Sequence, residues 1–291
     1  MPWGRVVSPS SGSTGSSRIL FVDGTGVPTE RRRELCREAR LRSWELVKLA
    51  AGDDYPEVDD AATELRAEVV AFAGPDGSQA KGVTVASGRE LPFACLPTGP
   101  DDLFARDLGV DPDDNLGILA ASEDSCDYYV DLAEVNGVTF VNYAAVGLDC
   151  TPARAADSVE PRGLIFTSTP AYLVSPQQPA ARLDWFSGWG RETCGAVFVS
   201  NNARRFESSV VGGRTRLDGG VLGIGILSPG RRRTSVSRRD AQWRELRART
   251  FAIDAAVPIR ADVDGRRIWL EPPVRFRILP RALRARIPRS G

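Results

Sequence analysis

The pattern of strand and helix signals changes near residue 128, and this change limits the folds that the chain can adopt. Through the first 110 residues, short runs of β-branched and aromatic residues alternate with polar, helix-forming segments. Such alternation predicts a parallel sheet with helices on both faces, in which ligands bind where the strands end. After residue 128, Asn-Gly and Asp-Gly pairs separate strand-like runs, as in antiparallel hairpins. We therefore expect two domains of different class.

The first domain, residues 1–127, is expected to be a doubly wound, Rossmann-like α/β domain. Its expected strands lie at Arg18–Val22, Trp44–Leu49, Glu68–Ala73 and Pro92–Leu96. Its expected helices lie at Thr29–Leu41, Pro56–Arg66 and Asp101–Leu108, and Pro28 stands near the start of the first of them.

The second domain, residues 128–291, is expected to be an antiparallel β-sandwich whose last residues pack back on the first domain. Asn136-Gly137, Asp218–Gly220 and Asp264-Gly265 each predict a hairpin turn. A helical pattern is expected only at Asp240–Arg249. Pro161–Trp189, rich in Pro, Ser and aromatic residues, is interpreted as a long excursion or lid rather than as core.

Composition excludes several classes of function. The chain has 38 basic and 38 acidic residues, and this balance argues against a dedicated nucleic-acid binder, which needs an excess of positive charge. Histidine is absent, which excludes Ser-His-Asp and Cys-His hydrolases and every histidine-ligated metal site. The five cysteines are scattered and indicate a reducing cytosol. We recognise neither a signal peptide nor an apolar stretch long enough to span a bilayer.

Two glycine turns follow successive strands of the first domain. Gly74–Ser78 follows the strand ending at Ala73, and Pro97–Asp102 follows the strand ending at Leu96. Glycine at a strand end lets the backbone approach a phosphate, and the next helix offers its N-terminal amides. Either turn alone also fits an ordinary strand-to-helix loop. A further strand ends in Asp23–Gly26, which we interpret as a turn because the lysine and spacing of a P-loop are absent.

The order of these motifs resembles the diacylglycerol kinase and sphingosine kinase family of lipid kinases, including its bacterial members. Ser8–Gly12 is similar to the family's Asn-Pro-x-Ser-Gly opening, and Gly74–Ser78 to its Gly-Gly-Asp-Gly-Thr loop. Pro97–Arg106 is similar to the Pro-Ala-Gly-Thr-x-Asn segment and its continuation. Further similar segments follow in the family's order: Phe140–Asp149, Val199–Asn202, Arg216–Gly220, and the closing Asp-Gly-Glu hairpin at Asp264–Arg266.

This resemblance implies an ATP- and Mg²⁺-dependent kinase that phosphorylates a hydroxyl of diacylglycerol or a related lipid. In that scheme the first domain holds the nucleotide and the second holds the lipid. The implied nucleotide-binding residues are Ser8, Ser11, Gly74, Asp76, Gly77, Ser78, Gly99 and Asp102. Asp264 and Asp76 are the implied catalytic carboxylates, with Asp264 as the base, and Asp218 is the implied ligand of a structural metal. Because phosphoryl transfer needs mainly positioning and charge neutralisation, a chain without histidine can perform it.

The chain departs from the family pattern at four positions of this site. Pro75 replaces a glycine and removes an N–H, and Pro100 replaces a threonine and removes a hydroxyl and an N–H. Asp102 replaces an asparagine and adds negative charge near a triphosphate. Arg266 replaces the glutamate of Asp-Gly-Glu and cannot act as a base. These departures support a second hypothesis, in which the chain is an inactive pseudokinase that binds a lipid or protein partner. A third reading is a kinase for a soluble hydroxyl compound.

The resemblance also implies a location for the protein. A lipid acceptor predicts a cytoplasmic protein in peripheral contact with the inner face of the membrane, and a homodimer is left open. Trp185, Phe186 and Trp189 could contact a membrane interface, or simply cap the β domain. The terminal arginines, among them Arg284 and Arg286, could meet anionic headgroups, or form a solvated basic edge.

Overall fold

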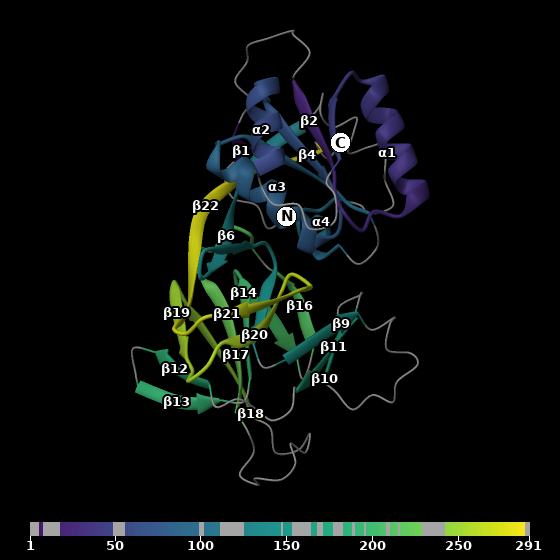
Figure 1. Ribbon diagram of the computed structural model, residues 1–291. Helices are drawn as coiled ribbons and strands as arrows, with labels where there is room; N and C mark the ends of the chain where they lie inside the picture. Colours follow the sequence, from purple (N-terminus) through teal and green to yellow (C-terminus); the bar gives the residue numbers. More distant parts are fainter. Residues whose placement is uncertain are drawn as a thin grey trace. The chain divides into compact units, whose positions relative to one another are not determined.

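The computed structural model of the chain divides into two compact units (Figure 1). The first contains residues 1–130 and 281–291, and the second contains residues 131–280. The structure describes residues 6–7, 18–48, 56–98, 102–110, 125–146, 148–152, 164–167, 171–176, 183–187, 190–194, 196–207, 210–214, 216–228 and 242–288. Two strands, β6 (Ser125–Val135) and β22 (Val274–Pro288), each contribute residues to both units.

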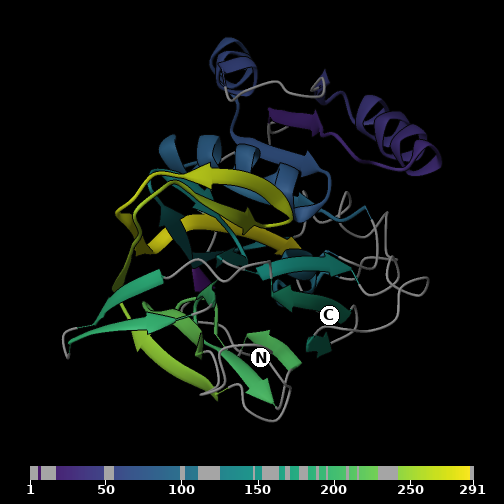
Figure 2. The same cartoon turned by 60° about the horizontal axis from the view of Figure 1, so that its bottom comes forward.

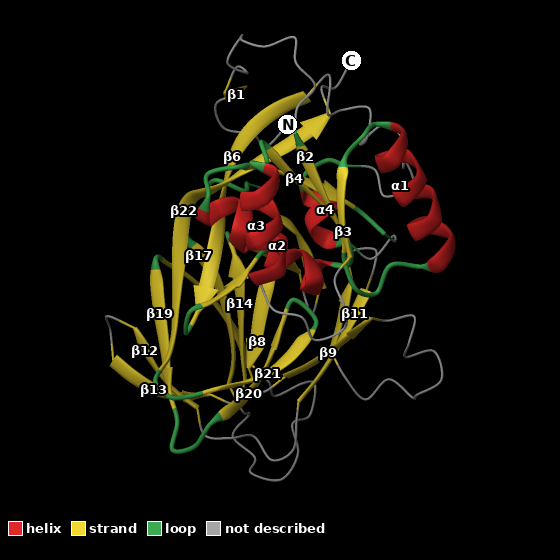
Figure 3. Cartoon of the chain, turned by 45° about the horizontal axis from the view of Figure 1, so that its top comes forward, coloured by secondary structure: helices red, strands yellow, loops and turns green. Residues whose placement is uncertain are grey.

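Every described helix belongs to the first unit. The helices lie in the purple-to-blue part of the chain in Figure 2 and are drawn in red in Figure 3. The helices are α1 (Thr29–Leu41), α2 (Pro56–Leu65), α3 (Asp76–Gly88) and α4 (Leu103–Asp107). The strands are β1 (Val6–Val7), β2 (Ile19–Asp23), β3 (Glu45–Lys48), β4 (Val69–Ala73) and β5 (Pro92–Leu96), with the first part of β6 and the last part of β22.

Strands β5, β4, β2 and β3 lie in that order and run parallel. All five residues of β2 and of β4 are buried, which explains their continuous apolar sequence, since a parallel sheet is covered on both faces. The last part of β22 extends the sheet, because Arg284–Arg286 pairs in parallel with Pro92–Ala94. The expected α/β class of the first domain is therefore confirmed.

The second unit is built of antiparallel strands. Besides parts of β6 and β22 it contains β7 (Val138–Phe140), β8 (Tyr143–Val146), β9 (Leu148–Pro152), β10 (Leu164–Thr167), β11 (Ala171–Pro176), β12 (Leu183–Ser187), β13 (Gly190–Cys194), β14 (Ala196–Asn201), β15 (Arg204–Glu207), β16 (Val210–Arg214), β17 (Leu222–Ser228), β18 (Gln242–Ala248), β19 (Thr250–Asp254), β20 (Ile259–Val263) and β21 (Arg266–Leu270).

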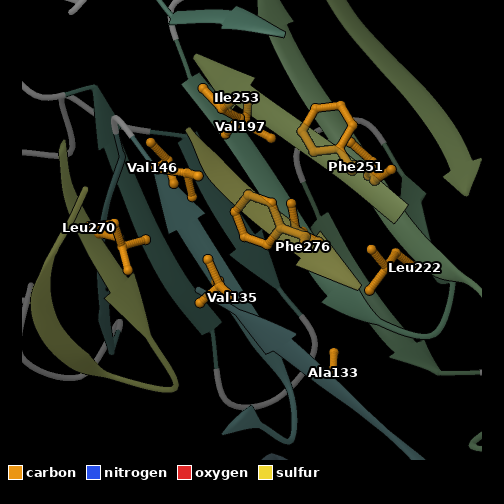
Figure 4. Close-up of a cluster of buried hydrophobic side chains, with 14 of the residues drawn as sticks. Ala133, Val135, Val146, Val197, Leu222, Phe251, Ile253, Leu270 and Phe276 are labelled. Carbon is orange, nitrogen blue, oxygen red and sulfur yellow. The ribbon is translucent and has the colours of Figure 1, made fainter. Parts of the chain in front are cut away.

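Two sheets enclose the core of this unit. One is six-stranded, in the order β18-β17-β14-β8-β20-β21, and the other contains β13, β12, β19 and the first part of β22. Side chains from both sheets meet in one cluster that includes Val146, Val197, Phe251, Leu270 and Phe276 (Figure 4). Strands β10, β11 and β9 form a small third sheet, and β15 pairs with β16. The expected antiparallel β-sandwich is confirmed.

Two of the expected hairpins are present. Asn136 and Gly137 join β6 to β7, and Asp264 and Gly265 join β20 to β21; all four residues have positive φ, as the tight hairpin turn requires. The third expected hairpin is wrong. Asp218–Gly220 precedes β17, which pairs with β14 and β18 rather than with the preceding strand β16.

Two other expectations in the second domain differ from the structure. Asp240–Arg249, expected to be a helix, contains the strand β18, which pairs with β17 over seven residues. The described parts of Pro161–Trp189, expected to be a lid, form β10, β11 and β12, each paired with another strand. Trp185 and Phe186 lie in β12, and Trp189 lies outside the described residues.

Candidate functional site

Three loops leave adjacent strands at one edge of the parallel sheet. The register pairs Asp23 with Ala73 and Ala73 with Leu96, so β2, β4 and β5 end side by side. Because the carboxyl ends of parallel strands are the usual place for ligands in such sheets, this edge is the candidate nucleotide site.

The first loop, Asp23–Gly26, packs directly against the second. The Gly24 amide donates to the Ala73 carbonyl at 2.8 Å, and a Cβ on Gly24 would lie 2.5 Å from that oxygen. A Cβ on Gly26, whose φ is +85°, would lie 3.1 Å from Cγ of Pro75. The sequence analysis interpreted this loop only as a turn. It assigned the family's opening Asn-Pro-x-Ser-Gly motif to the segment that contains Ser8 and Ser11, and both residues lie outside the described residues. A strand followed directly by Asp-Gly-Thr-Gly is the sequence signal that could have identified this loop as part of the site.

The second loop, from Gly74, turns into α3. Its backbone is closed by Ser78, whose amide and hydroxyl donate to the Pro75 carbonyl at 2.8 and 2.9 Å. Gln79 Nε2 donates to the Gly74 carbonyl at 2.7 Å. A Cβ on Gly74 would collide with Ser78 Oγ, so the glycine is required by the fold of the loop itself. Pro75 has φ −66° and stands at the N-cap of α3, a place where its missing N–H breaks no helical hydrogen bond.

Asp76 and Asp102 lie together at the start of α4. The Asp76 carboxylate accepts hydrogen bonds from the amides of Leu103 and Phe104 at 2.9 and 3.3 Å, and it is 9% exposed. Asp102 occupies the N-cap of α4, and its Oδ2 accepts the Thr98 amide at 2.6 Å. Both carboxylates therefore hold the third loop in place. Gly99 and Pro100 of that loop lie outside the described residues.

A buried arginine and a buried thiol complete this edge of the sheet. Arg31 of α1 is 8% exposed, and its Nη2 donates to the Pro97 carbonyl at 3.1 Å. Burial raises the pKa of the Cys95 thiol well above its ordinary value, and the charges of Asp102 and Asp76 raise it further. One guanidinium, from α1, and two carboxylates, from the starts of α3 and α4, thus contact the backbone at this edge of the sheet.

These residues fit a magnesium nucleotide better than a metal ion held by protein alone. Among the described residues, no group of three acidic, Cys or His side chains could hold a metal. Mg²⁺ commonly uses one or two carboxylates and takes its other ligands from phosphates and water, so Asp76 and Asp102 are the candidate protein ligands. The first amides of α3, at Asp76 and Gly77, and the Arg31 guanidinium suit the phosphates.

Asp264, in the second unit, fastens the segment between β7 and β8. Its carboxylate accepts the amides of Val141, Asn142 and Tyr143 at 2.7, 3.0 and 2.9 Å, and its own amide donates to the Tyr143 carbonyl at 3.0 Å. Burial raises the pKa of Asp264, while the three amide hydrogen bonds oppose that rise. A carboxylate has about four acceptor positions, so one remains for another donor.

Arg266 and Asp262 flank Asp264 in the same hairpin. Nε and Nη2 of Arg266 are buried and have no hydrogen-bond partner among the described residues, and the charge of Arg266 lowers the pKa of Asp264. Asp262 is 5% exposed and accepts the Gly265 amide at 2.8 Å. Burial raises the pKa of Asp262 to about 6. The sequence interpretation did not single out Asp262, although a second carboxylate two residues before Asp264 was visible.

Asn142 connects the Asp264 segment to two buried arginines. Its Oδ1 accepts Nη2 of Arg204 at 3.3 Å and Nη2 of Arg214 at 3.1 Å. Asn201 Nδ2 bridges the carbonyls of Asp131 and Val141 at 2.8 and 3.1 Å. Two segments singled out by the family resemblance, around Asn142 and Asn201, therefore meet in one buried hydrogen-bond network.

Asp218, the expected metal ligand, is held by an arginine. Both of its carboxylate oxygens accept from Arg216, at 2.9 and 3.1 Å. The amides of Gly219 and Gly220 donate to Asn202 Oδ1 and Asp131 Oδ2 at 2.7 and 2.6 Å. A metal at Asp218 would have to displace this ion pair.

Comparison with known proteins supports the fold. No family model matches the chain, and no curated protein matches it. A diacylglycerol kinase from Bacillus anthracis str. Sterne superposes with a TM-score of 0.61 at 15% identity, over 94% of this chain and 97% of that one. The chain has the fold of the bacterial diacylglycerol kinase-like proteins. Two further such structures from the same organism give TM-scores of 0.62, at 14% and 16% identity, over 92% and 94% of this chain.

The resemblance seen in the sequence is thus confirmed at the level of the fold. Within the parts of the chain that the structure describes, no helix has both the length and the apolar character needed to cross a bilayer.

Proposed function

We propose that the chain is an ATP-dependent lipid kinase that transfers the γ-phosphoryl group to a hydroxyl of diacylglycerol or a related lipid. The observation that carries this proposal is the extent of the structural match, which includes 94% of this chain and 97% of a diacylglycerol kinase chain. A match of this extent includes both units. Transfer between two substrates needs a nucleotide-binding part and an acceptor-binding part, and a match to one unit alone would not support it.

The first unit would bind the nucleotide at the edge formed by its three loops. Asp76 and Asp102 would hold Mg²⁺, which neutralises phosphate charge when bound. Gly74, Gly77 and Ser78 would lie against the phosphates with the first amides of α3, and Arg31 would add a positive charge. Ser8, Ser11 and Gly99 remain proposed nucleotide-binding residues.

The second unit would bind the lipid and accept its proton. Asp264 is the proposed base, and its three amide bonds hold it in a fixed position with one acceptor site to spare. Its elevated pKa keeps it a better proton acceptor than an ordinary aspartate. Asp218 remains the proposed ligand of a structural metal. We further propose that the protein acts in the cytoplasm, in peripheral contact with the inner face of the membrane, where its lipid acceptor lies. A homodimer is compatible with this proposal.

The second candidate is an inactive protein of the same fold that binds a lipid or protein partner. Arg266 favours it, since an arginine stands where the resemblance expects a glutamate. Pro75, which has no amide to offer a phosphate, favours it as well.

Transfer of labelled phosphate from ATP to diacylglycerol in mixed micelles tests both candidates. We expect transfer by the natural chain and a loss of about a hundredfold or more in Asp76→Asn, which retains an acceptor for α4 but loses the charge for Mg²⁺. Glu57→Gln, an exposed change on α2, is the matched control and should leave the rate unchanged.

A chain carrying Pro75→Gly, Pro100→Thr, Asp102→Asn and Arg266→Glu separates the candidates further. If this variant transfers phosphate and the natural chain does not, the natural chain is the inactive protein of the second candidate. Absence of transfer from both chains, with both folded, would contradict the kinase assignment.

A further inference from the structure

Helix α1 presents a row of exposed arginines on the side that faces away from the sheet. The helix packs on β2 and β3, and its buried residues are Arg31, Leu35 and Ala39. Four residues spaced as on one helical face are exposed on the other side, and we call them the basic ridge: Arg33, Arg37, Arg40 and Leu41. Leu41 is 72% exposed, and the Arg37 side chain is 71% exposed.

Two acids of α1 are already engaged with arginines outside the ridge. Glu34 lies 3.6 Å from the buried Arg31, and Glu38 accepts a hydrogen bond from Arg42 Nη1 at 2.7 Å. Arg37 reaches the same Glu38 only at 3.4 Å. Neither acid therefore neutralises the ridge.

The other two arginines of the ridge have no partner of their own. The side chains of Arg33 and Arg40 make no hydrogen bond or ion pair with another described residue. Glu30, in the first turn, is the one fully exposed acid of α1. Three arginines against one acid leave this face with a net positive charge.

The opposite face of the sheet carries the opposite charge. The connections from β2 to β3 and from β3 to β4 run in opposite directions along the sheet, so right-handed crossovers place α1 and α2 on opposite faces. Helix α2 packs beside α3, apart from α1 (Figure 3). Its exposed side carries three acids spaced as on one helical face, which we call the acidic ridge: Glu57, Asp60 and Glu64.

This separation of charge gives the first unit two different faces. The chain as a whole has equal numbers of basic and acidic residues, so the ridges do not follow from an overall excess of either charge. An anionic surface attracts the face of α1 and repels the face of α2. It would therefore bind the first unit in one orientation.

The arginines near the C-terminus offer less free charge than the basic ridge. Arg286 donates to both oxygens of Asp127 at 2.8 and 3.1 Å, and Arg284 lies 3.1 Å from the same carboxylate. One acid thus holds two of the arginines that the sequence analysis considered for contact with headgroups.

We propose that the basic ridge docks the protein on an anionic lipid surface. Its arginines meet the headgroups, and the exposed Leu41 side chain enters the boundary between headgroups and acyl chains. The inference rests on the proposed function, since a lipid acceptor brings the protein to a membrane. It adds the surface and the orientation of that contact.

Co-sedimentation of the full chain with phosphatidylcholine vesicles, with and without phosphatidylserine, tests the inference in the absence of ATP. We expect binding that is at least about tenfold tighter with phosphatidylserine and that weakens as salt is added. Arg37→Gln should weaken it about fivefold, and the triple change Arg33→Gln, Arg37→Gln and Arg40→Gln at least about a hundredfold. Leu41→Trp should tighten binding, because indoles are favoured at the membrane interface.

The acidic ridge supplies the matched control, with the triple change Glu57→Gln, Asp60→Asn and Glu64→Gln. A general effect of net charge predicts tighter binding in this control, and natural binding in a chain that carries both triple changes. Docking through α1 predicts little change in the control, and in the chain with both triple changes the same loss as in the basic-ridge variant. Circular dichroism confirms that each variant is folded.

Three results would overturn the inference. The first is equal binding to vesicles with and without phosphatidylserine, and the second is natural binding in the folded chain with both triple changes. The third is an absence of vesicle binding together with self-association that the basic-ridge variant loses in sedimentation. That result would assign the basic ridge to the acidic ridge of a second copy.

The docking and the kinase proposals fail separately. Transfer to diacylglycerol in neutral mixed micelles should be unchanged in the basic-ridge variant, because none of its changes lies in the residues assigned to phosphoryl transfer. A chain that transfers phosphate in micelles and binds no vesicles contradicts the docking alone. A chain that binds vesicles through α1 and transfers no phosphate contradicts the kinase proposal alone.

Discussion

Asp264 combines two properties at the scale of the single residue. Its carboxylate is buried, which is unfavourable for a charge, and three backbone amides satisfy it. The amides belong to residues more than 120 positions away in the chain, so the carboxylate joins two distant segments. The contacts of Asp264 therefore support a structural role, which is to fix the connection between β7 and β8, independently of any role in proton transfer.

Removal of this carboxylate should destabilise the second unit. Asp264→Ala leaves three buried amides without an acceptor, and we expect a loss of about 3 kcal/mol in the free energy of unfolding. Asp264→Asn retains one acceptor oxygen and should cost about half as much. Denaturant titration measures both. A loss below about 0.5 kcal/mol in Asp264→Ala would contradict the structural role.

The neighbouring carboxyl, Asp262, should make stability depend on pH. Because burial raises its pKa in the folded chain from 3.8 to about 6, the folded chain holds this proton more tightly than the unfolded chain does. The resulting stabilisation is complete below pH 3.8 and is lost as the pH rises through about 6. The raised pKa of Asp264 acts in the same direction.

Asp262→Asn cannot titrate, so it should gain stability relative to the natural chain as the pH rises from 4 to 7. The gain should reach up to about 3 kcal/mol. Paired thermal unfolding curves across this range measure it, with Asp60→Asn, an exposed change on α2, as the control. A gain that does not vary with pH would show that burial does not shift the pKa of this carboxyl.

Single residues show where sequence reasoning ends. Asp76, Asp102 and Asp264 could be named because the segments that contain them resemble motifs of the lipid kinase family. Their amide partners could not be named. The contacts of Asp76 with Leu103 and Phe104, and those of Asp264 with Val141–Tyr143, join residues far apart in the chain. The sequence analysis interpreted Asp23–Gly26 only as a turn, and the pairing of β2 with β4 shows that this loop lies beside the loop from Gly74.

At the scale of elements, β18 shows how tertiary pairing overrides local propensity. Gln242–Ala248 contains Glu, Leu, Arg and Ala, all good helix formers. The segment also alternates, with Leu246 and Ala248 packed against the core and Arg247 exposed. This alternation lets the segment pair with β17 as a strand. In a segment this short, the sequence alone does not distinguish the alternation of a strand from the pattern of a helix.

Helix α3 offers a matched pair of glycines for a test at this scale. A Cβ on Gly82 would collide with the Phe72 ring of β4 and lie 3.1 Å from Phe93, whereas a Cβ on Gly88 meets nothing within 4 Å. We expect Gly82→Ala to destabilise the chain by about 1–3 kcal/mol through overpacking. Gly88→Ala should stabilise it by about 0.5–1 kcal/mol, because alanine favours helix. Chemical denaturation compares them, and equal effects would contradict the close packing of α3 on β4.

At the scale of the whole molecule, the order of two structural classes along the chain was predictable. Alternating strand and helix signals predicted the parallel sheet, and the expected hairpin turns predicted the antiparallel sandwich. The sequence analysis expected the last residues to pack back on the first domain, but it did not predict that a single strand makes both pairings. Strand β22 pairs with β19 at Val274–Arg277 and with β5 at Arg284–Arg286, so one strand takes part in both an antiparallel and a parallel pairing. Nothing in its alternating sequence marks where one pairing ends and the other begins.

The central claim for the whole molecule is that the three loops of the first unit form a magnesium-dependent nucleotide site. Calorimetric titration of the full chain with ATP, in Mg²⁺ and again in EDTA, tests it most directly. We predict saturable binding in Mg²⁺ that is lost in EDTA and strongly weakened in Asp76→Asn. An absence of ATP binding in Mg²⁺ by the folded chain, or binding that is equal in Mg²⁺ and EDTA, would contradict the account.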